Sequence, residues 1–124
     1  MIAYLRGEPG GPVVQALPDD PNETCYAHTI NLLQVYYDFI RRYSELIARQ
    51  TLVDLAAANV IERRDLNQPF FRRVGQLKAR GGISLADCFC MAPAQQLGGE
   101  VVTSDHHEFD PLVPLGIVPI RFIR

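Results

Sequence analysis

The sequence has no surplus of basic residues and no long apolar run, and each absence excludes a class of protein. Its formal net charge is −2 at pH 7, which argues against a protein that holds nucleic acid through bulk electrostatics. No stretch of about 18 apolar residues is present, and residues 1–6 lack the basic segment and apolar run of a secretory signal. We therefore expect a cytoplasmic protein without a membrane segment.

The chain also has few cysteines, and their spacing suits neither disulfides nor zinc. Cys88 and Cys90 are two residues apart, so on a helix their side chains point in different directions. We expect both of them, and Cys25, to be small buried apolar residues in a reducing compartment. A glycine fingerprint for a nucleotide cofactor is missing too, because the glycines of residues 7–11 follow a helical segment rather than a strand.

The composition is that of a globular protein. Of the 124 residues, 48% are hydrophobic and 21% are charged, which predicts a single domain over residues 1–124 with one core. The predicted helices cover residues 1–6, 12–17, 30–43, 44–59, 67–80 and 85–97, and the predicted strands cover residues 23–28, 60–63, 101–103 and 118–123. Helices that separate strands in this way predict an α/β fold of three layers, with helices on both faces of a mostly parallel sheet.

The predicted helix 30–43, with Thr29 as its N-cap, has apolar residues around most of its circumference. Asn31, Gln34 and Asp38 form one narrow polar stripe on it. We expect this helix to be buried on several sides. Two explanations remain open: it is an enclosed core helix, or part of it forms a homodimer surface.

Basic residues gather between positions 60 and 80, although the whole chain is slightly acidic. Such a cluster is most often the solvated face of a helix, and any contact with RNA would have to be local to it. The members of this cluster are Arg63, Arg64, Arg72, Arg73, Lys78 and Arg80.

Two carboxylates mark a candidate metal site. Asp87 lies in the first turn of the predicted helix 85–97, and Asp105 follows the strand 101–103, where open parallel sheets bind their ligands. Two converging carboxylates suit a hydrated divalent cation such as Mg²⁺. A structural explanation competes with this one, because Ser84 and Asp87 have the spacing of a capping box, and an acid in a first turn also favours the helix dipole.

The segment after Asp105 carries further candidates. For Asp105 and Asp110 the structural alternative is an ordinary turn. His106 and His107 suggest a metal ligand or a general base, but adjacent histidines do not converge on a helix or strand, so we favour a polar turn. His28 is predicted to be a part-buried strand residue.

Three segments together resemble a known family. The run ISLADCFCMAPAQQLGGEVVTSDHHEFDPL at positions 83–112 is similar to the C-terminal half of bacterial PIN domains, the fold of the toxic ribonuclease of VapBC-type toxin–antitoxin pairs. INLLQVYYDFIRR from Ile30 resembles their central helix, and AYLRGEPG from Ala3 resembles the end of their first helix. The resemblance covers nearly the whole chain.

The resemblance implies an endoribonuclease in which four acidic positions surround one or two Mg²⁺ or Mn²⁺ ions. It places the third acid on Asp87 and the fourth on Asp105, with Asp110 nearby. Thr103 or Ser104 would then hydrogen-bond the substrate or a metal-bound water. An antitoxin protein and an RNA substrate are the implied partners.

The sequence departs from that pattern at the two other acidic positions. The central helix carries Gln34 where the second acid is expected, with Asn31 as a possible supporting residue. The first acid would end a strand that precedes Met1. The resemblance implies a sheet order of 3-2-1-4-5, so this missing first strand would be the central one, and we expect a late start of the sequence to be the reason.

Three interpretations follow. The chain is a metal-dependent endoribonuclease, or it is a non-catalytic relative that keeps the dimer surface and the antitoxin groove, or it is a truncated product that is unstable alone. The missing acids favour the second interpretation for the chain as given, and the retained Asp87 and Asp105 favour the first for its ancestry.

Overall fold

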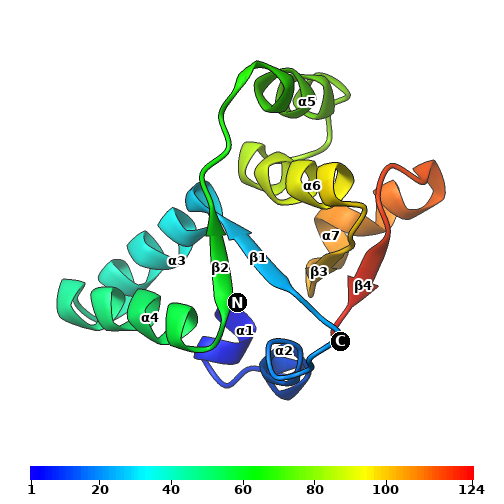
Figure 1. Cartoon of the computed structure of the whole chain (residues 1–124). Coiled ribbons are helices and arrows are strands. Elements are labelled where there is room, and N and C mark those ends of the chain that lie inside the picture. Colours follow the sequence, from blue (N-terminus) through cyan, green and yellow to red (C-terminus); the bar gives the residue numbers. More distant parts are fainter. The chain divides into compact units, whose positions relative to one another are not determined.

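The computed structural model describes residues 1–124, apart from the side chains of Ile2 and Ala3, and it contains two compact units, Met1–Arg63 and Arg64–Arg124 (Figure 1). The first unit comprises α1 (Ile2–Leu5), α2 (Gly11–Ala16), β1 (Cys25–His28), α3 (Thr29–Arg42), α4 (Glu45–Ala57) and β2 (Val60–Arg63). The second comprises α5 (Gln68–Ala79), α6 (Leu85–Leu97), β3 (Val101–Thr103), α7 (His106–Phe109), the 3₁₀ helix η1 (Asp110–Leu115) and β4 (Ile120–Phe122). A single domain over residues 1–124 stays a prediction.

Each unit contains a parallel pair of strands. β1 pairs with β2, with Cys25 opposite Val60, and β3 pairs with β4, with Val101 opposite Ile120. The helices α3 and α4 connect the first pair, and α7 and η1 connect the second, because parallel strands require a crossover. The predicted α/β class is confirmed. In the expected order 3-2-1-4-5, strands 2 and 3 are neighbours, and so are strands 4 and 5. The pairs β1–β2 and β3–β4 correspond to these two neighbouring pairs.

The first unit has its core inside the α3–α4 hairpin, where Val35, Phe39, Ala48 and Leu55 are buried. The fully buried residues of α3 are Asn31, Val35 and Phe39, which are four residues apart and therefore lie on one face. The prediction that this helix is buried on several sides is thus wrong for the single chain.

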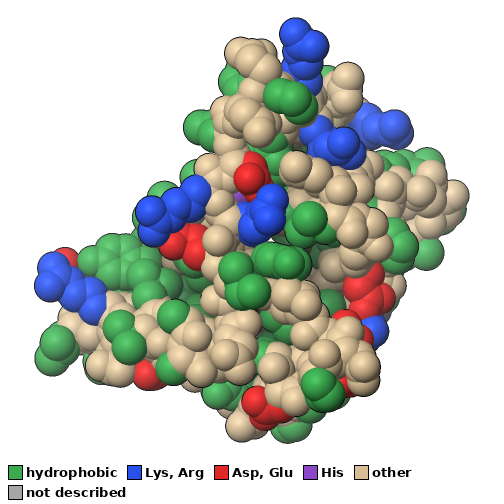
Figure 2. Space-filling view, in the orientation of Figure 1, with side chains coloured by type: hydrophobic (Ala, Val, Ile, Leu, Met, Phe, Trp, Pro, Cys, Tyr) green, Lys and Arg blue, Asp and Glu red, His purple; other side chains and the backbone are tan. Residues whose placement is uncertain are grey.

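Large apolar side chains remain on the surface of the hairpin, part of which Figure 2 shows in green. Their exposed fractions range from 38% to 79%. The set consists of Leu33, Tyr37, Ile40, Tyr43, Leu46, Ile47 and Val53.

The second unit is built around α5 and α6. Asn67 caps α5 by accepting a hydrogen bond from the Phe70 N–H at 3.1 Å. Phe70, Val74 and Leu77 are buried along one face of this helix, and the rings of Phe70 and Phe89 lie 5.9 Å apart. α6 ends at Gly98, whose φ of 65° is a left-handed conformation that favours glycine. The predicted helices 67–80 and 85–97 are confirmed.

Several local predictions need correction. The N-cap of α3 is His28 rather than Thr29, because the His28 Nδ1 accepts the Ile30 N–H at 3.1 Å. His28 is 5% exposed and therefore more buried than predicted. Of the three cysteines, Cys88 alone is fully buried. None of the helices in the described part of the chain is both long and apolar enough to span a membrane.

Candidate functional site

Asp87 is held at the start of α6 by the residue that caps this helix. The Ser84 Oγ accepts the Asp87 N–H at 3.1 Å and donates to the Asp87 Oδ2 at 2.5 Å. The serine therefore fixes both the backbone and the carboxylate of the same residue. The predicted capping role of Ser84 is confirmed, and it leaves the other carboxylate oxygen, Oδ1, for a further ligand.

Asp105 follows β3 and begins α7. The Asp105 N–H donates to the Thr103 Oγ1 at 3.0 Å, and the Asp105 Oδ1 accepts the Glu108 N–H at 3.0 Å. Because Asp105 caps a helix, residues 106–109 are helical, and the predicted polar turn is wrong there. The Thr103 hydroxyl positions Asp105 in this structure.

Glu108 links the two carboxylates, a role that was not predicted from the sequence. Its Oε2 accepts the Ser84 N–H at 3.1 Å, while its own N–H is bound by Asp105. A continuous set of hydrogen bonds therefore runs from Asp105 through Glu108 and Ser84 to Asp87. The spacing of Glu108 three residues after Asp105 is that of a capping box and was the available signal.

The electrostatics of Asp87 reflect this clustering. Burial raises the pKa of Asp87 above its ordinary value, and the Glu108 and Asp105 carboxylates raise it further, whereas the hydrogen bond from Ser84 lowers it. Two neighbouring carboxylates thus oppose the ionisation of Asp87. A bound cation would relieve that repulsion.

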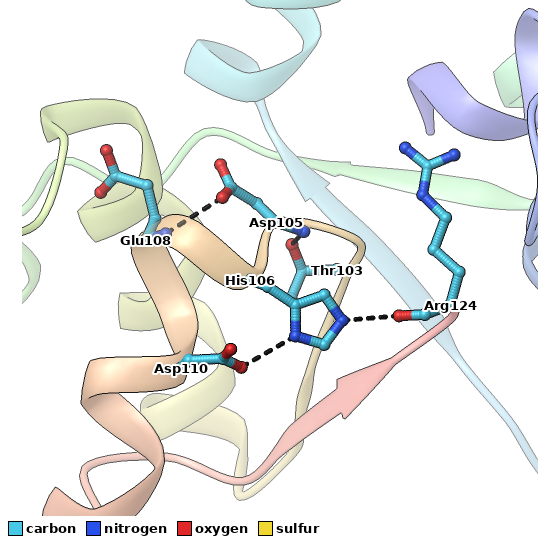
Figure 3. A network of polar contacts seen from close by, with 6 residues as sticks. All are labelled: Thr103, Asp105, His106, Glu108, Asp110 and Arg124. Atoms are coloured by element: carbon cyan, nitrogen blue, oxygen red, sulfur yellow. Dashed lines mark hydrogen bonds and ion pairs between the residues drawn. The ribbon is translucent and has the colours of Figure 1, made fainter.

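His106 and Asp110 form a second group on the opposite side of α7 (Figure 3). The His106 Nδ1 lies 2.9 Å from the Asp110 Oδ1, and its Nε2 lies 2.6 Å from the Arg124 carbonyl oxygen. The His106 ring also stacks on Phe122, with centroids 4.1 Å apart. The Arg124 carbonyl and the Asp110 carboxylate raise the pKa of His106.

Figure 3 shows the carboxylates of Asp105 and Glu108 on the same side of α7, whereas Asp110 points toward His106. Asp110 therefore belongs to the contacts that hold the chain end. Ser104, between Thr103 and Asp105, is partly exposed.

The other candidates lie on α3 in the first unit. Asn31 is buried with 8% exposure, and Gln34 is partly buried. Asp38, one turn further along, forms an ion pair with Arg42 at 2.9 Å.

The residues fit a hydrated cation better than an enclosed metal cage. Among the described side chains, no three His, Cys, Asp or Glu residues converge closely enough to hold a metal ion by themselves. Mg²⁺ and similar ions nevertheless bind through one or two carboxylates and keep several waters. The raised pKa of Asp87 beside two further carboxylates is consistent with such an ion.

Comparisons with known proteins agree with this architecture. The sequence model of the PIN domain matches residues 1–111. A chain in the crystal structure of VapBC2 from Rickettsia felis bound to a DNA fragment from their promoter is similar in fold, with a TM-score of 0.70 and 15% sequence identity. The match covers 97% of this chain and 90% of that chain. No curated protein matches significantly. The expected resemblance is confirmed: the chain belongs to the PIN domain family.

Proposed function

We propose that this chain hydrolyses RNA phosphodiesters as a Mg²⁺- or Mn²⁺-dependent endoribonuclease of the toxin–antitoxin type. The observation that carries the proposal is that hydrogen bonds connect the carboxylate at the start of α6 with the carboxylate that follows β3. Asp87 and Asp105 are linked there through Ser84 and Glu108. Membership of the PIN domain family supports the same assignment.

Asp87 and Asp105 would hold the divalent ion. When bound, this ion supplies a water that ionises near neutral pH and neutralises charge on the phosphate. Ser84 holds the Asp87 Oδ2 through its hydroxyl, and the Glu108 carboxylate holds Ser84 by accepting the Ser84 N–H. These two residues therefore orient the ligands and are positioning residues. Thr103 and Ser104 directly precede Asp105, and we assign them supporting roles. Asp110 supports the site only indirectly, by pairing with His106 on the other side of α7.

The test is Mn²⁺-dependent cleavage of a labelled single-stranded RNA. Asp87→Asn and Asp105→Asn should each abolish Mn²⁺-stimulated cleavage, since they keep the shape of the side chain and remove its charge. His107→Asn is the matched control, because His107 is exposed beside the same site. Equal cleavage by the parent and both aspartate variants would assign the activity to a contaminant and reject the proposal.

A second candidate function is a catalytically incomplete PIN-like protein that acts by binding an antitoxin or by forming a homodimer. Two observations favour it. Gln34 stands where an acid is expected, and the first unit has a cavity of about 290 Å³ with a mostly apolar lining. The apolar side chains on this lining include Leu32, Leu33 and Leu52.

The two candidates differ in a simple measurement. A catalytically incomplete protein would cleave no RNA and would self-associate through the α3–α4 hairpin with or without bound Mn²⁺. Tyr37→Glu places a charge on this exposed apolar surface, where Tyr37 is 46% exposed. Sedimentation should therefore show a dimer for the parent and a monomer for Tyr37→Glu. A parent that stays monomeric at high concentration would exclude the homodimer.

A further inference from the structure

The helix α5 exposes basic side chains in a segment without a single acid. Residues 66–86 contain no Asp or Glu, although the whole chain carries more acidic than basic residues. Arg72, Lys78 and Arg80 are exposed and Arg73 is partly exposed. Figure 2 shows Lys and Arg side chains gathered around α5 at the top of the view.

The charges of α5 are arranged differently from those of the helices in the first unit. On α3, Arg42 pairs with Asp38 at 2.9 Å, and on α4, Arg49 pairs with Glu45 at 2.9 Å, in each case one turn apart. No such acid exists on α5, because its sequence is QPFFRRVGQLKA. Its cations are thus not neutralised along the helix, which leaves them able to attract an anionic ligand.

The arginines share one side of α5. Arg72 and Arg80 are eight residues apart, and Arg73 is seven residues before Arg80, so all three lie on one flank. The buried face, with Phe70 and Val74, points elsewhere. This flank, Arg72, Arg73 and Arg80, is called the arginine flank below, and it extends ~12 Å along the helix.

The C-terminal end of α5 lies next to the carboxylate pair. Lys78 donates from its Nζ to the Ile83 carbonyl oxygen at 2.7 Å. Ile83 precedes Ser84, which binds the Asp87 carboxylate. In the middle of α5, the Arg73 Nη1 donates to the Oε1 of Gln95, near the C-terminal end of α6, at 3.4 Å. A ligand that reaches the C-terminal end of α5 would therefore lie beside the start of α6.

An exposed aromatic ring beside Arg72 indicates the class of ligand. Phe71 lies about 100° around the helix from Arg72, on the other side of the exposed face of α5 from Arg80. Phe71 is 62% exposed, while its neighbour Phe70 is 1% exposed. Proteins that bind single-stranded nucleic acid combine cations along the phosphate backbone with aromatic side chains on which bases stack. An acidic peptide would need the cations alone.

We infer that single-stranded RNA crosses the exposed face of α5, with its phosphate backbone on the arginine flank and a base on Phe71, and is led from there to the carboxylate pair. This inference rests on the proposed function for the choice of RNA as the substrate. The net charge of −2 argues against binding of nucleic acid over the whole surface and favours a local contact such as this one.

The test is fluorescence anisotropy of the full chain with a labelled oligouridylate in EDTA, so that binding is measured without cleavage. Arg72→Ala combined with Arg80→Ala should weaken binding at low salt by about tenfold or more and reduce the slope of log K against log salt by about 1.4. Phe71→Ala should weaken binding by about tenfold and leave this slope unchanged.

The matched control is Arg41→Ala combined with Arg49→Ala, which removes two exposed arginines from α3 and α4. It should bind RNA as the parent does. The inference is overturned if the Arg72 and Arg80 variant shows the affinity and salt slope of this control. It is also overturned if polyglutamate competes as well as RNA and Phe71→Ala has no effect, since the ligand would then be an acidic protein segment. RNA binding without Mn²⁺-dependent cleavage would reject the proposed function and leave this inference standing.

Discussion

Replacing Ser84 with alanine should separate two effects of one side chain. Its Oγ caps α6 through the Asp87 N–H, and it also donates to the Asp87 carboxylate at 2.5 Å. Ser44 is a matched comparison, because it caps α4 by accepting the Ile47 N–H at 3.2 Å. In the described part of the chain, no hydrogen bond joins Ser44 to a carboxylate.

The loss of a serine cap lowers the free energy of unfolding by about 1 kcal/mol. For a chain of this length we expect a fall in melting temperature of about 4 °C. Ser84→Ala and Ser44→Ala should therefore be similarly destabilised, which thermal unfolding followed by circular dichroism would measure.

The two variants should differ in the pH dependence of Mn²⁺ binding. The hydrogen bond from Ser84 lowers the pKa of Asp87, against the effects of burial and of two nearby carboxylates. Its loss raises that pKa further, and a carboxylate must lose its proton to bind a metal. Calorimetric titrations should show the midpoint of binding at a higher pH in Ser84→Ala and unchanged in Ser44→Ala. Identical pH profiles in the two variants would refute the reasoning.

Two further predictions concern the stability of the second unit. Phe70 is buried and Phe71 is exposed. In urea denaturation, Phe70→Ala should therefore lower the free energy of unfolding by about 4 kcal/mol, whereas Phe71→Ala should change it by less than about 0.5 kcal/mol. Equal effects of the two substitutions would contradict the core packing. The pKa of His106 is raised above its ordinary 6.5 by the Arg124 carbonyl and by Asp110, so the stability it contributes is fully present below that value and is lost as the pH rises through the folded-state pKa. The difference in unfolding free energy between the parent and His106→Asn should therefore be larger at about pH 5.5 than at about pH 8.5, and a difference independent of pH would argue against these contacts.

Local signals explain why much of the fold was predictable. The cap Ser84 and the terminating Gly98 define both ends of α6, and the β-branched residues Val60 and Ile61 begin β2. Such signals depend on residues that are close in the sequence. They also place Asp87 and Asp105 at the ends of elements, as expected.

Contacts between distant residues explain what the sequence did not reveal. The bond from the Ser84 N–H to Glu108 spans 24 residues, so this contact depends on packing that no local pattern encodes, although the spacing of Glu108 after Asp105 marked it as a helix-capping residue. The contact of His106 with the Arg124 carbonyl spans 18 residues, and it helps to hold α7 where a turn was expected. The exposure of Tyr37 likewise depends on which elements pack against α3, and the sequence of this helix alone does not encode that.

The central claim is that Asp87 and Asp105 bind a divalent cation together. Titration calorimetry with Mn²⁺ tests it most directly, with Asp54→Asn as a control that removes an exposed carboxylate from α4. We expect the parent and Asp54→Asn to bind Mn²⁺ with equal affinity, and folded Asp87→Asn and Asp105→Asn each to bind it at least about tenfold more weakly. The absence of Mn²⁺ binding by the parent, or equal binding by all four proteins, would contradict it.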